Sequence, residues 1–256
     1  MRRFLFTIGY KTLSAINQMG DMAIMLISAL SWAFIPPLRI RNIFKQMEFI
    51  GVKSIFIVIL TGLFTGGVLA LQSYYAFRKF GGESLLGATV ALSMTRELGP
   101  VLTALMVTGR AGSAIAAELG TMRVTEQIDA LAVMAINPVK YLVVPRIIAG
   151  ILVVPILTVI DDFVGIVGGY IIGVGLLKIN PGIFMAKMIE MVELSDIFNG
   201  LFKSVCFGLL LTLIGCYKGY HTRGGAEGVG RATTEAVVVS SVSILVGDYI
   251  LTSLLF

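Results

Sequence analysis

The sequence predicts an all-α integral membrane protein with five transmembrane helices. Apolar residues make up 57% of the 256-residue chain, above the roughly 45–50% of soluble domains. The mean hydropathy is +0.92, and several apolar runs are long enough to cross a bilayer. Little sequence remains outside these runs, so we expect one membrane domain over residues 1–256, with an N-terminal interfacial region over residues 1–45.

The N-terminal region has an amphipathic helical pattern. Its apolar face carries Leu5, Ile8, Ile16 and Met19, and its polar face carries Arg3, Lys11, Ser14, Asn17 and Gln18. The apolar run at 22–35 is shorter than the ~20 residues of a span and lacks a signal-peptide cleavage site. We expect an interfacial elbow helix, with a frayed basic tail as the alternative. The apolar run at 22–35 is expected to stay in the mature protein as a separate piece that dips into the membrane or lies at its interface.

The first two spans are predicted over residues 54–77 and 84–109. The first is uncharged, and its Gly62, Gly66 and Gly67 form a small-residue face suited to close helix contact. The second contains Arg96, Glu97 and Pro100. Because proline lacks a backbone N–H, we expect a kink near the two charged residues.

Three more spans are predicted, over residues 147–177, 197–217 and 236–256. The third is long and contains Pro155, so we expect it to be tilted or kinked. Its Asp161 and Asp162 are interpreted as caps of a broken helix, with a proton relay as the alternative. Lys203 lies in the fourth span and Asp248 near the end of the fifth.

Two connecting segments carry local signals. Asn180 followed by Pro181 predicts the start of a short interfacial helix in the 178–196 connection. The glycine-rich stretch 224–230 resembles a phosphate loop, but no Gly-Lys-Ser/Thr follows it. We interpret it as a flexible loop before the last span.

The positive residues predict the orientation. With the N-terminus in the cytosol, the cytosolic segments hold fourteen Lys and Arg residues and the opposite side holds four. Cytosolic segments are enriched in these residues. We therefore expect the C-terminus on the periplasmic side.

Arg96 and Glu97 lie in the middle of a predicted span, where charge is costly. Adjacent helical residues point about 100° apart, so each needs its own partner. They could pair with Lys203, Asp161, Asp162 or Asp248 as structural contacts. Alternatively, they could form the wall of a cavity that meets a charged headgroup.

The segment from Glu118 to Leu131, after the second span, has a helical pattern. Val124, Ile128, Leu131 and Ala135 share one face, and Arg123, Thr125, Glu126 and Asp129 lie opposite. The apolar stripe could simply pack on the spans. The charged face could instead dock on a cytosolic motor, and the two interpretations are compatible.

The sequence offers no sign of catalysis. It contains no Walker motif, no metal-ligand cluster and no arrangement of a nucleophile with a base. Cys206 and Cys216 fall in one apolar run, which argues against a structural disulfide. The basic residues flank the spans instead of forming one patch, which argues against nucleic-acid binding.

The run from Arg96 to Leu105, continued by residues 109–114 and 117–131, closely resembles the MlaE-type permeases. The likeness extends to residues 228–234 and Asp248-Tyr249. It covers the chain from about residue 45 to the end, and the adjacent acids at 161 and 162 depart from it, since the family often has one. These permeases are membrane subunits of ABC transporters that work with MCE-domain proteins.

The resemblance implies a homodimer in a bacterial inner membrane, with two cytosolic ATPase subunits and an outer ring of MCE proteins. The cargo would be phospholipid moved between the inner membrane and the envelope or outer membrane. ATP and Mg would bind the partner ATPase, and this chain would bind no cofactor. It implies a coupling helix with Glu118, Arg123, Glu126 and Asp129, and a lipid cavity lined or gated by Arg96, Glu97, Lys203, Asp248, Gln72, Leu69, Leu71 and Tyr75.

Two other functions compete with a lipid permease. An ion-coupled secondary carrier could use Arg96, Glu97 and Asp162 as a relay, although no internal repeat of the kind common in such carriers is visible. A membrane scaffold is the other alternative. A scaffold has no need for so many charges within its spans.

Overall fold

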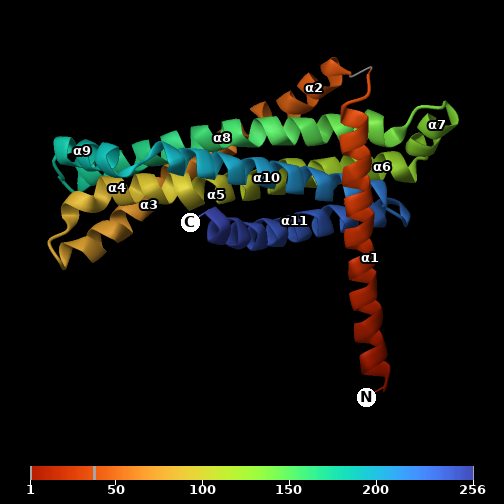
Figure 1. The fold of residues 1–256 in the computed structure, drawn as a ribbon, viewed down its shortest axis with the longest axis horizontal. Coiled ribbons are helices and arrows are strands. Elements are labelled where there is room, and N and C mark those ends of the chain that lie inside the picture. The colour runs from red at the N-terminus through yellow and green to blue at the C-terminus, as the bar shows by residue number, and fades with distance from the viewer. Residues whose placement is uncertain (1, 37–38, 256) are drawn as a thin grey trace.

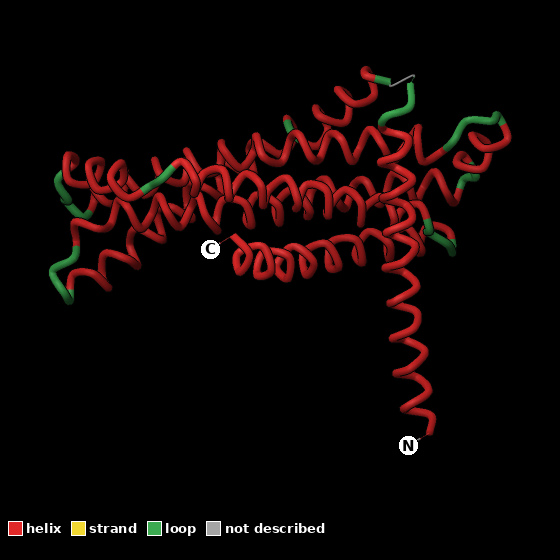
Figure 2. The backbone as a smooth tube through the Cα atoms, viewed as in Figure 1, coloured by secondary structure: helices red, strands yellow, loops and turns green. Residues whose placement is uncertain are grey.

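The computed structural model describes residues 2–36 and 39–255, and for residues 2–11, 14 and 15 it describes the backbone only. These residues are mostly helical and contain no strand. Five helical segments are long and apolar enough to cross a membrane, which confirms the predicted all-α membrane fold. The long helices pack side by side (Figure 1), and short loops join them at the two ends of the bundle (Figure 2).

The five membrane-length segments contain most of the helices. The first holds α2 (Ile40–Ile50), a 3-10 turn at Val52–Ser54 and α3 (Ile55–Arg78). The second holds a 3-10 turn at Glu83–Leu85, then α4 (Leu86–Ser93), α5 (Gly99–Val107) and α6 (Ser113–Val124), joined by π-helical turns at Met94–Leu98 and Thr108–Gly112. The third holds α8 (Val144–Tyr170) between π-helical turns at Val139–Val143 and Ile171–Leu176, and the last two are α10 (Leu194–Tyr220) and α11 (Gly225–Leu255).

Three further helices mark the two ends of the bundle. They are α1 (Arg2–Ala33), α7 (Gln127–Val133) and α9 (Pro181–Met191). Figure 1 places α7 at one end and α9 at the other, with α1 crossing the bundle steeply near the α7 end. The predicted helix after Pro181 is confirmed, because the Asn180 side chain accepts hydrogen bonds from the backbone N–H groups of Gly182 and Ile183.

The N-terminal region forms one helix, where the sequence predicted an elbow helix followed by a separate apolar piece. Met25 and Ala29 of α1 are buried against the bundle, whereas Ile16 and Met19 are exposed. The structure does not describe the side chains of several residues on the two predicted faces, so those faces stay predictions: Arg3, Leu5, Ile8, Lys11 and Ser14. An α1 that crosses the spans with exposed apolar side chains fits a position in the membrane interface.

Glycines set the closest helix contacts, as predicted for the first span. A Cβ at Gly66 of α3 would lie 1.8 Å from the Gly165 carbonyl oxygen of α8, and one at Gly62 would meet Asp161. At the next interface, a Cβ at Gly208 of α10 would lie 2.4 Å from the Gly150 carbonyl oxygen of α8. Lipid tails are as apolar as leucine, so helix association in a membrane depends on such close packing.

The two prolines act differently. The π-helical turn Met94–Leu98 ends two residues before Pro100, so the regular α-helix is interrupted near the position where the sequence predicted a kink. In contrast, α8 continues through Pro155 and through Asp161 and Asp162. The interpretation of these two acids as caps of a broken helix is therefore wrong.

The glycine-rich stretch 224–230 is helical from Gly225 onward, so its interpretation as a flexible loop is wrong. The turn needs glycine for its positive φ angles, +92° at Gly224 and +67° at Gly225, and Gly228 needs it because a Cβ there would lie 1.9 Å from the Arg223 carbonyl oxygen. Past the turn, Glu227 and Arg231 pair one helical turn apart at 3.3 Å. Pairs of this kind, acid first, favour the helix by about 0.2–0.5 kcal/mol.

Candidate functional site

Lys203 lies at the centre of a charged layer inside the bundle. Its ammonium group is fully buried and lies 2.7 Å from a Glu97 carboxylate oxygen and 3.2 Å from an Asp248 carboxylate oxygen. It also donates a 2.7 Å hydrogen bond to the Thr252 hydroxyl. The structure thus joins three sequence-predicted site residues from the second, fourth and fifth spans.

Pro100 explains why this layer forms at the π-helical turn. In a regular helix the N–H of residue 100 would bond to the carbonyl of Arg96, but proline has no N–H. Lys203 donates to that carbonyl instead, at 3.1 Å. A single lysine therefore satisfies both a freed backbone oxygen and the neighbouring Glu97 carboxylate.

Arg96 pairs with an acid that the sequence analysis missed. Its guanidinium lies 2.7 Å from a carboxylate oxygen of Asp196, which is almost fully buried. The other Asp196 oxygen accepts the backbone N–H of Glu193 at the start of α10. Asp196 and Lys203 are seven residues apart, two helical turns, and this spacing could have placed both on the face that meets Arg96 and Glu97.

A hollow of about 450 Å³ lies on α3. Gln72 and Leu69 line it, together with Phe64, Thr65, Val68 and Leu98. Leu98 directly follows Glu97 in the sequence, but none of Arg96, Glu97, Lys203 and Asp248 lines the hollow. Its walls are mainly apolar, as a site for lipid chains requires.

The structure does not bring all predicted cavity residues together. Leu71 lines a different groove, formed with Gly168, Ile171 and Ile172 of the third span. Tyr75 is exposed, and its ring stands edge-on to that of Tyr74 at a centroid distance of 5.9 Å. The predicted single wall is therefore divided between two neighbouring grooves, which share Phe64 and Val68 of α3.

The segment predicted as one coupling helix is divided in two. The helix of the second span extends to Val124, and α7 begins at Gln127. Between them Glu126 adopts a left-handed conformation with a φ of +58°, which ends the helix. Glu118 therefore belongs to the transmembrane helix, where its carboxylate binds the buried Arg146 guanidinium at 2.8 Å.

The turn itself is held by an ion pair and by an apolar anchor. Arg123 and Asp129 pair at 2.6 Å across the turn, and both side chains are partly exposed. Ile128 is buried in the core. The inward packing of Ile128 is consistent with a helix that packs on the spans. The accessible Arg123 and Asp129 are consistent with a charged face that could dock on a partner.

Asp161 and Asp162 pack against glycines of two different helices. A Cβ at Gly62 of α3 would lie 2.5 Å from an Asp161 carboxylate oxygen, and one at Gly99 would lie 1.7 Å from an Asp162 oxygen. The two acids thus occupy space that only glycine leaves open. They do not join the charged layer around Lys203 among the contacts of the described residues.

Comparison with known proteins agrees with this geometry. The family model described as Permease MlaE matches residues 43–254. A probable ABC transporter permease protein of Rickettsia conorii is 46% identical over 98% of this chain and 96% of its own length. The intermembrane phospholipid transport system permease protein MlaE of Haemophilus influenzae is 40% identical over 99% of this chain and 97% of its own length.

A plant protein is also similar. TRIGALACTOSYLDIACYLGLYCEROL 1, a chloroplastic protein of Arabidopsis thaliana, is 40% identical over 84% of this chain and 62% of its own length. The family match, over residues 43–254, covers most of the chain and nearly the full length of the five membrane-length segments. The chain is a multi-pass membrane protein that belongs to the MlaE permease family.

Proposed function

We propose that this permease is the membrane subunit of an ATP-driven transporter that moves phospholipid between the inner membrane and the cell envelope. The charged layer and the apolar hollow on α3 carry the proposal. A phospholipid has a charged headgroup and apolar chains, and this chain offers both a charged cluster of Lys203, Glu97 and Asp248 and an apolar hollow whose lining includes Leu69 and Leu98. The name of the Haemophilus relative, an intermembrane phospholipid transport system permease protein, supports the same cargo.

The working unit in this proposal is a homodimer. One face of α3 exposes Phe64 and Val68, and α11 exposes Val242, Leu245 and Tyr249. A second copy related by a two-fold axis would cover such faces and close the shallow hollow into a chamber. A ring of MCE proteins would receive the lipid on the outer side.

Energy would come from two cytosolic ATPase subunits, which would hold ATP and Mg, so this chain would not be the enzyme. The turn around Glu126, with Arg123, Asp129 and α7, lies at the end of the bundle opposite α9. In the proposed orientation this end faces the cytosol. Closure of the ATPase pair would move α7 and so reshape the chamber through α6.

Co-purification and reconstitution test the proposal. The chain would be purified from its native membrane with its partners and placed in vesicles that contain a labelled phospholipid. We expect lipid transfer that requires ATP and the ATPase. Transfer by the chain alone along an ion gradient would contradict the proposal and favour the secondary carrier.

A further inference from the structure

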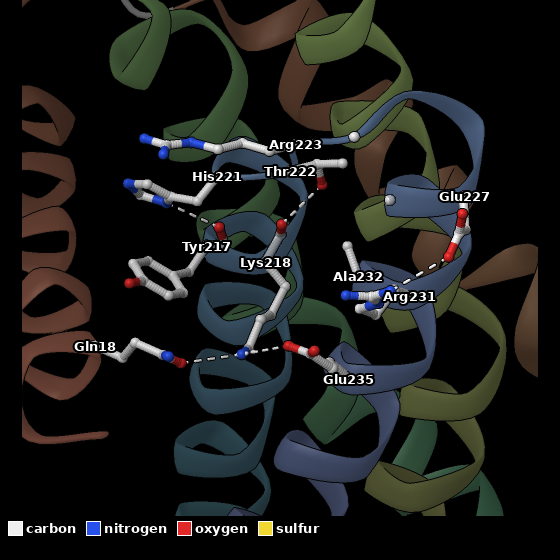
Figure 3. A pocket seen from close by; sticks show the side chains of 12 residues that line it. Gln18, Tyr217, Lys218, His221, Thr222, Arg223, Glu227, Arg231, Ala232 and Glu235 are labelled. Atoms are coloured by element: carbon white, nitrogen blue, oxygen red, sulfur yellow. Dashed lines mark hydrogen bonds and ion pairs between the residues drawn. The ribbon is translucent and has the colours of Figure 1, made fainter. Parts of the chain in front are cut away.

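A polar cavity lies far from the charged layer, where α1 crosses the ends of α10 and α11. Its volume is about 360 Å³. Figure 3 shows Gln18 entering from α1, while Lys218, His221 and Arg223 enter from the end of α10 and the turn after it. The start of α11 supplies Glu227, Arg231 and Glu235.

The depth of this cavity places it at the membrane surface. The 27 residues of α10 span about 40 Å at 1.5 Å per residue, the thickness of a bilayer with its headgroups. Asp196 marks one end of α10 and Lys218 lies near the other. The cavity therefore lies in a headgroup layer, where α1 crosses the bundle (Figure 1), and Gln18 of α1 lines it.

The charges in the cavity are almost balanced, with one cation left over. Lys218 pairs with Glu235 at 2.9 Å, and Arg231 pairs with Glu227 at 3.3 Å, so these four charges cancel. Among the residues that the structure describes, Arg223 forms no hydrogen bond or ion pair. The cavity thus offers one uncompensated positive charge.

The groups near Arg223 complete an anion site. Figure 3 shows the side chains of Arg223 and His221 extending side by side toward α1. A guanidinium presents paired N–H donors whose geometry matches two phosphate oxygens. Lys218 lies in the same cavity, but Glu235 and Gln18 already hold its ammonium group at 2.9 and 3.1 Å, so Arg223 is the cation left for a ligand.

We propose that this cavity binds the phosphodiester headgroup of an anionic phospholipid that resides in the adjacent leaflet, separately from the transported lipid. A phosphodiester carries one negative charge, which equals the charge that Arg223 leaves uncompensated. Basic pockets between helices at this depth are typical sites for anionic headgroups. A lipid bound there would tie α1 to α10 and α11, and its chains would extend along the exposed apolar side chains of α1.

The test measures lipid retention by the purified full-length chain. The protein is equilibrated in mild detergent with equal amounts of phosphatidylglycerol and phosphatidylcholine, and retained lipid is counted by native mass spectrometry. We expect wild type to prefer phosphatidylglycerol by roughly tenfold or more, the size of a charged hydrogen-bonded contact. Arg223→Gln should abolish the preference, and Glu227→Gln, which frees Arg231, should increase it.

Two controls keep the result specific. Arg41→Gln removes the same charge from an exposed residue outside the cavity and should leave the preference unchanged. Equal losses in Arg41→Gln and Arg223→Gln would indicate diffuse attraction and overturn the proposal. Glu97→Ala should also keep the preference, because loss in that variant would identify the retained lipid as the cargo.

A competition experiment separates the lipid from a soluble anion. Inorganic phosphate and glycerophosphoglycerol would be added to the wild-type protein that holds phosphatidylglycerol. We expect neither to displace the lipid at millimolar concentration, since the acyl chains add apolar contacts. Displacement by either compound would show that the site takes a free phosphate compound and would overturn the lipid assignment.

Discussion

Gly66 of α3 and Gly165 of α8 meet backbone to backbone, so closely that a methyl group at Gly66 would lie 1.8 Å from the Gly165 carbonyl oxygen. This contact holds the first span, which lines the hollow, against the third span. The two helices cannot approach in this way with any side chain between them. The position of the hollow therefore depends on a pair of residues that have no functional groups.

Replacing Gly66 by alanine should destabilise the protein. Overpacking of this kind costs typically 1–3 kcal/mol, and here the obstacle is backbone that cannot rotate away. The matched control is Gly109→Ala in the second span, where a Cβ would meet nothing within 4 Å. Thermal unfolding in detergent should show a lower midpoint for Gly66→Ala alone, and equal midpoints would contradict this packing.

The charged layer should respond asymmetrically to substitution. Lys203 is fully buried, whereas Glu97 and Asp248 retain some exposure. The double variant Glu97→Gln, Asp248→Asn leaves the buried Lys203 ammonium group without a counter-charge. It should lower the free energy of unfolding by about 3–5 kcal/mol. Lys203→Met leaves two carboxylates that the protein covers only in part, and it should cost less.

Denaturation of the two variants under identical detergent conditions measures this difference. A triple variant with all three charges removed should recover part of the loss, because it leaves no uncompensated charge. The account of this layer would be wrong if Lys203→Met were the less stable protein.

Arg123→Gln should reduce transport with little effect on stability. The Arg123–Asp129 pair is partly exposed, and such pairs contribute roughly 0–1 kcal/mol. Lys187→Gln breaks a similarly exposed pair in α9, at the opposite end of the bundle, and serves as the control. ATP-dependent lipid transfer should fall in the first variant only, and full transfer by Arg123→Gln would remove this pair from the coupling mechanism.

Glu126 allows the backbone to be tested separately from the charge. Its left-handed conformation disfavours most side chains but suits glycine and asparagine. Glu126→Asn should therefore fold as well as wild type, and Glu126→Val should be less stable. If the carboxylate takes part in coupling, Glu126→Asn should still lose ATP-dependent transfer.

The sequence alone predicted the elements that are determined by residues close together in the chain. The five spans followed from the length and apolarity that a bilayer demands, and α9 followed from the Asn180–Pro181 signal. The interruption before Pro100 followed from the missing N–H of proline. In each of these cases a short stretch of sequence determines the structure.

The features that the sequence analysis missed depend on tertiary contacts. Asp196 is far from Arg96 in sequence, and only the packing of α10 against the second span brings them together. The end of the helix before Glu126 lacks a glycine or proline to mark it. Conversely, the glycines after Gly224 suggested a loop, but the helix of the last span extends over them.

The most direct test of a lipid chamber that is reshaped from the cytosol is photocrosslinking at Gln72 in the reconstituted complex. The control position is Phe163 of α8, whose side chain is largely exposed. We expect phospholipid adducts at position 72 to fall when a non-hydrolysable ATP analogue closes the ATPase pair, while adducts at position 163 stay constant. Adducts that do not change at position 72, or that fall equally at both positions, would contradict the chamber.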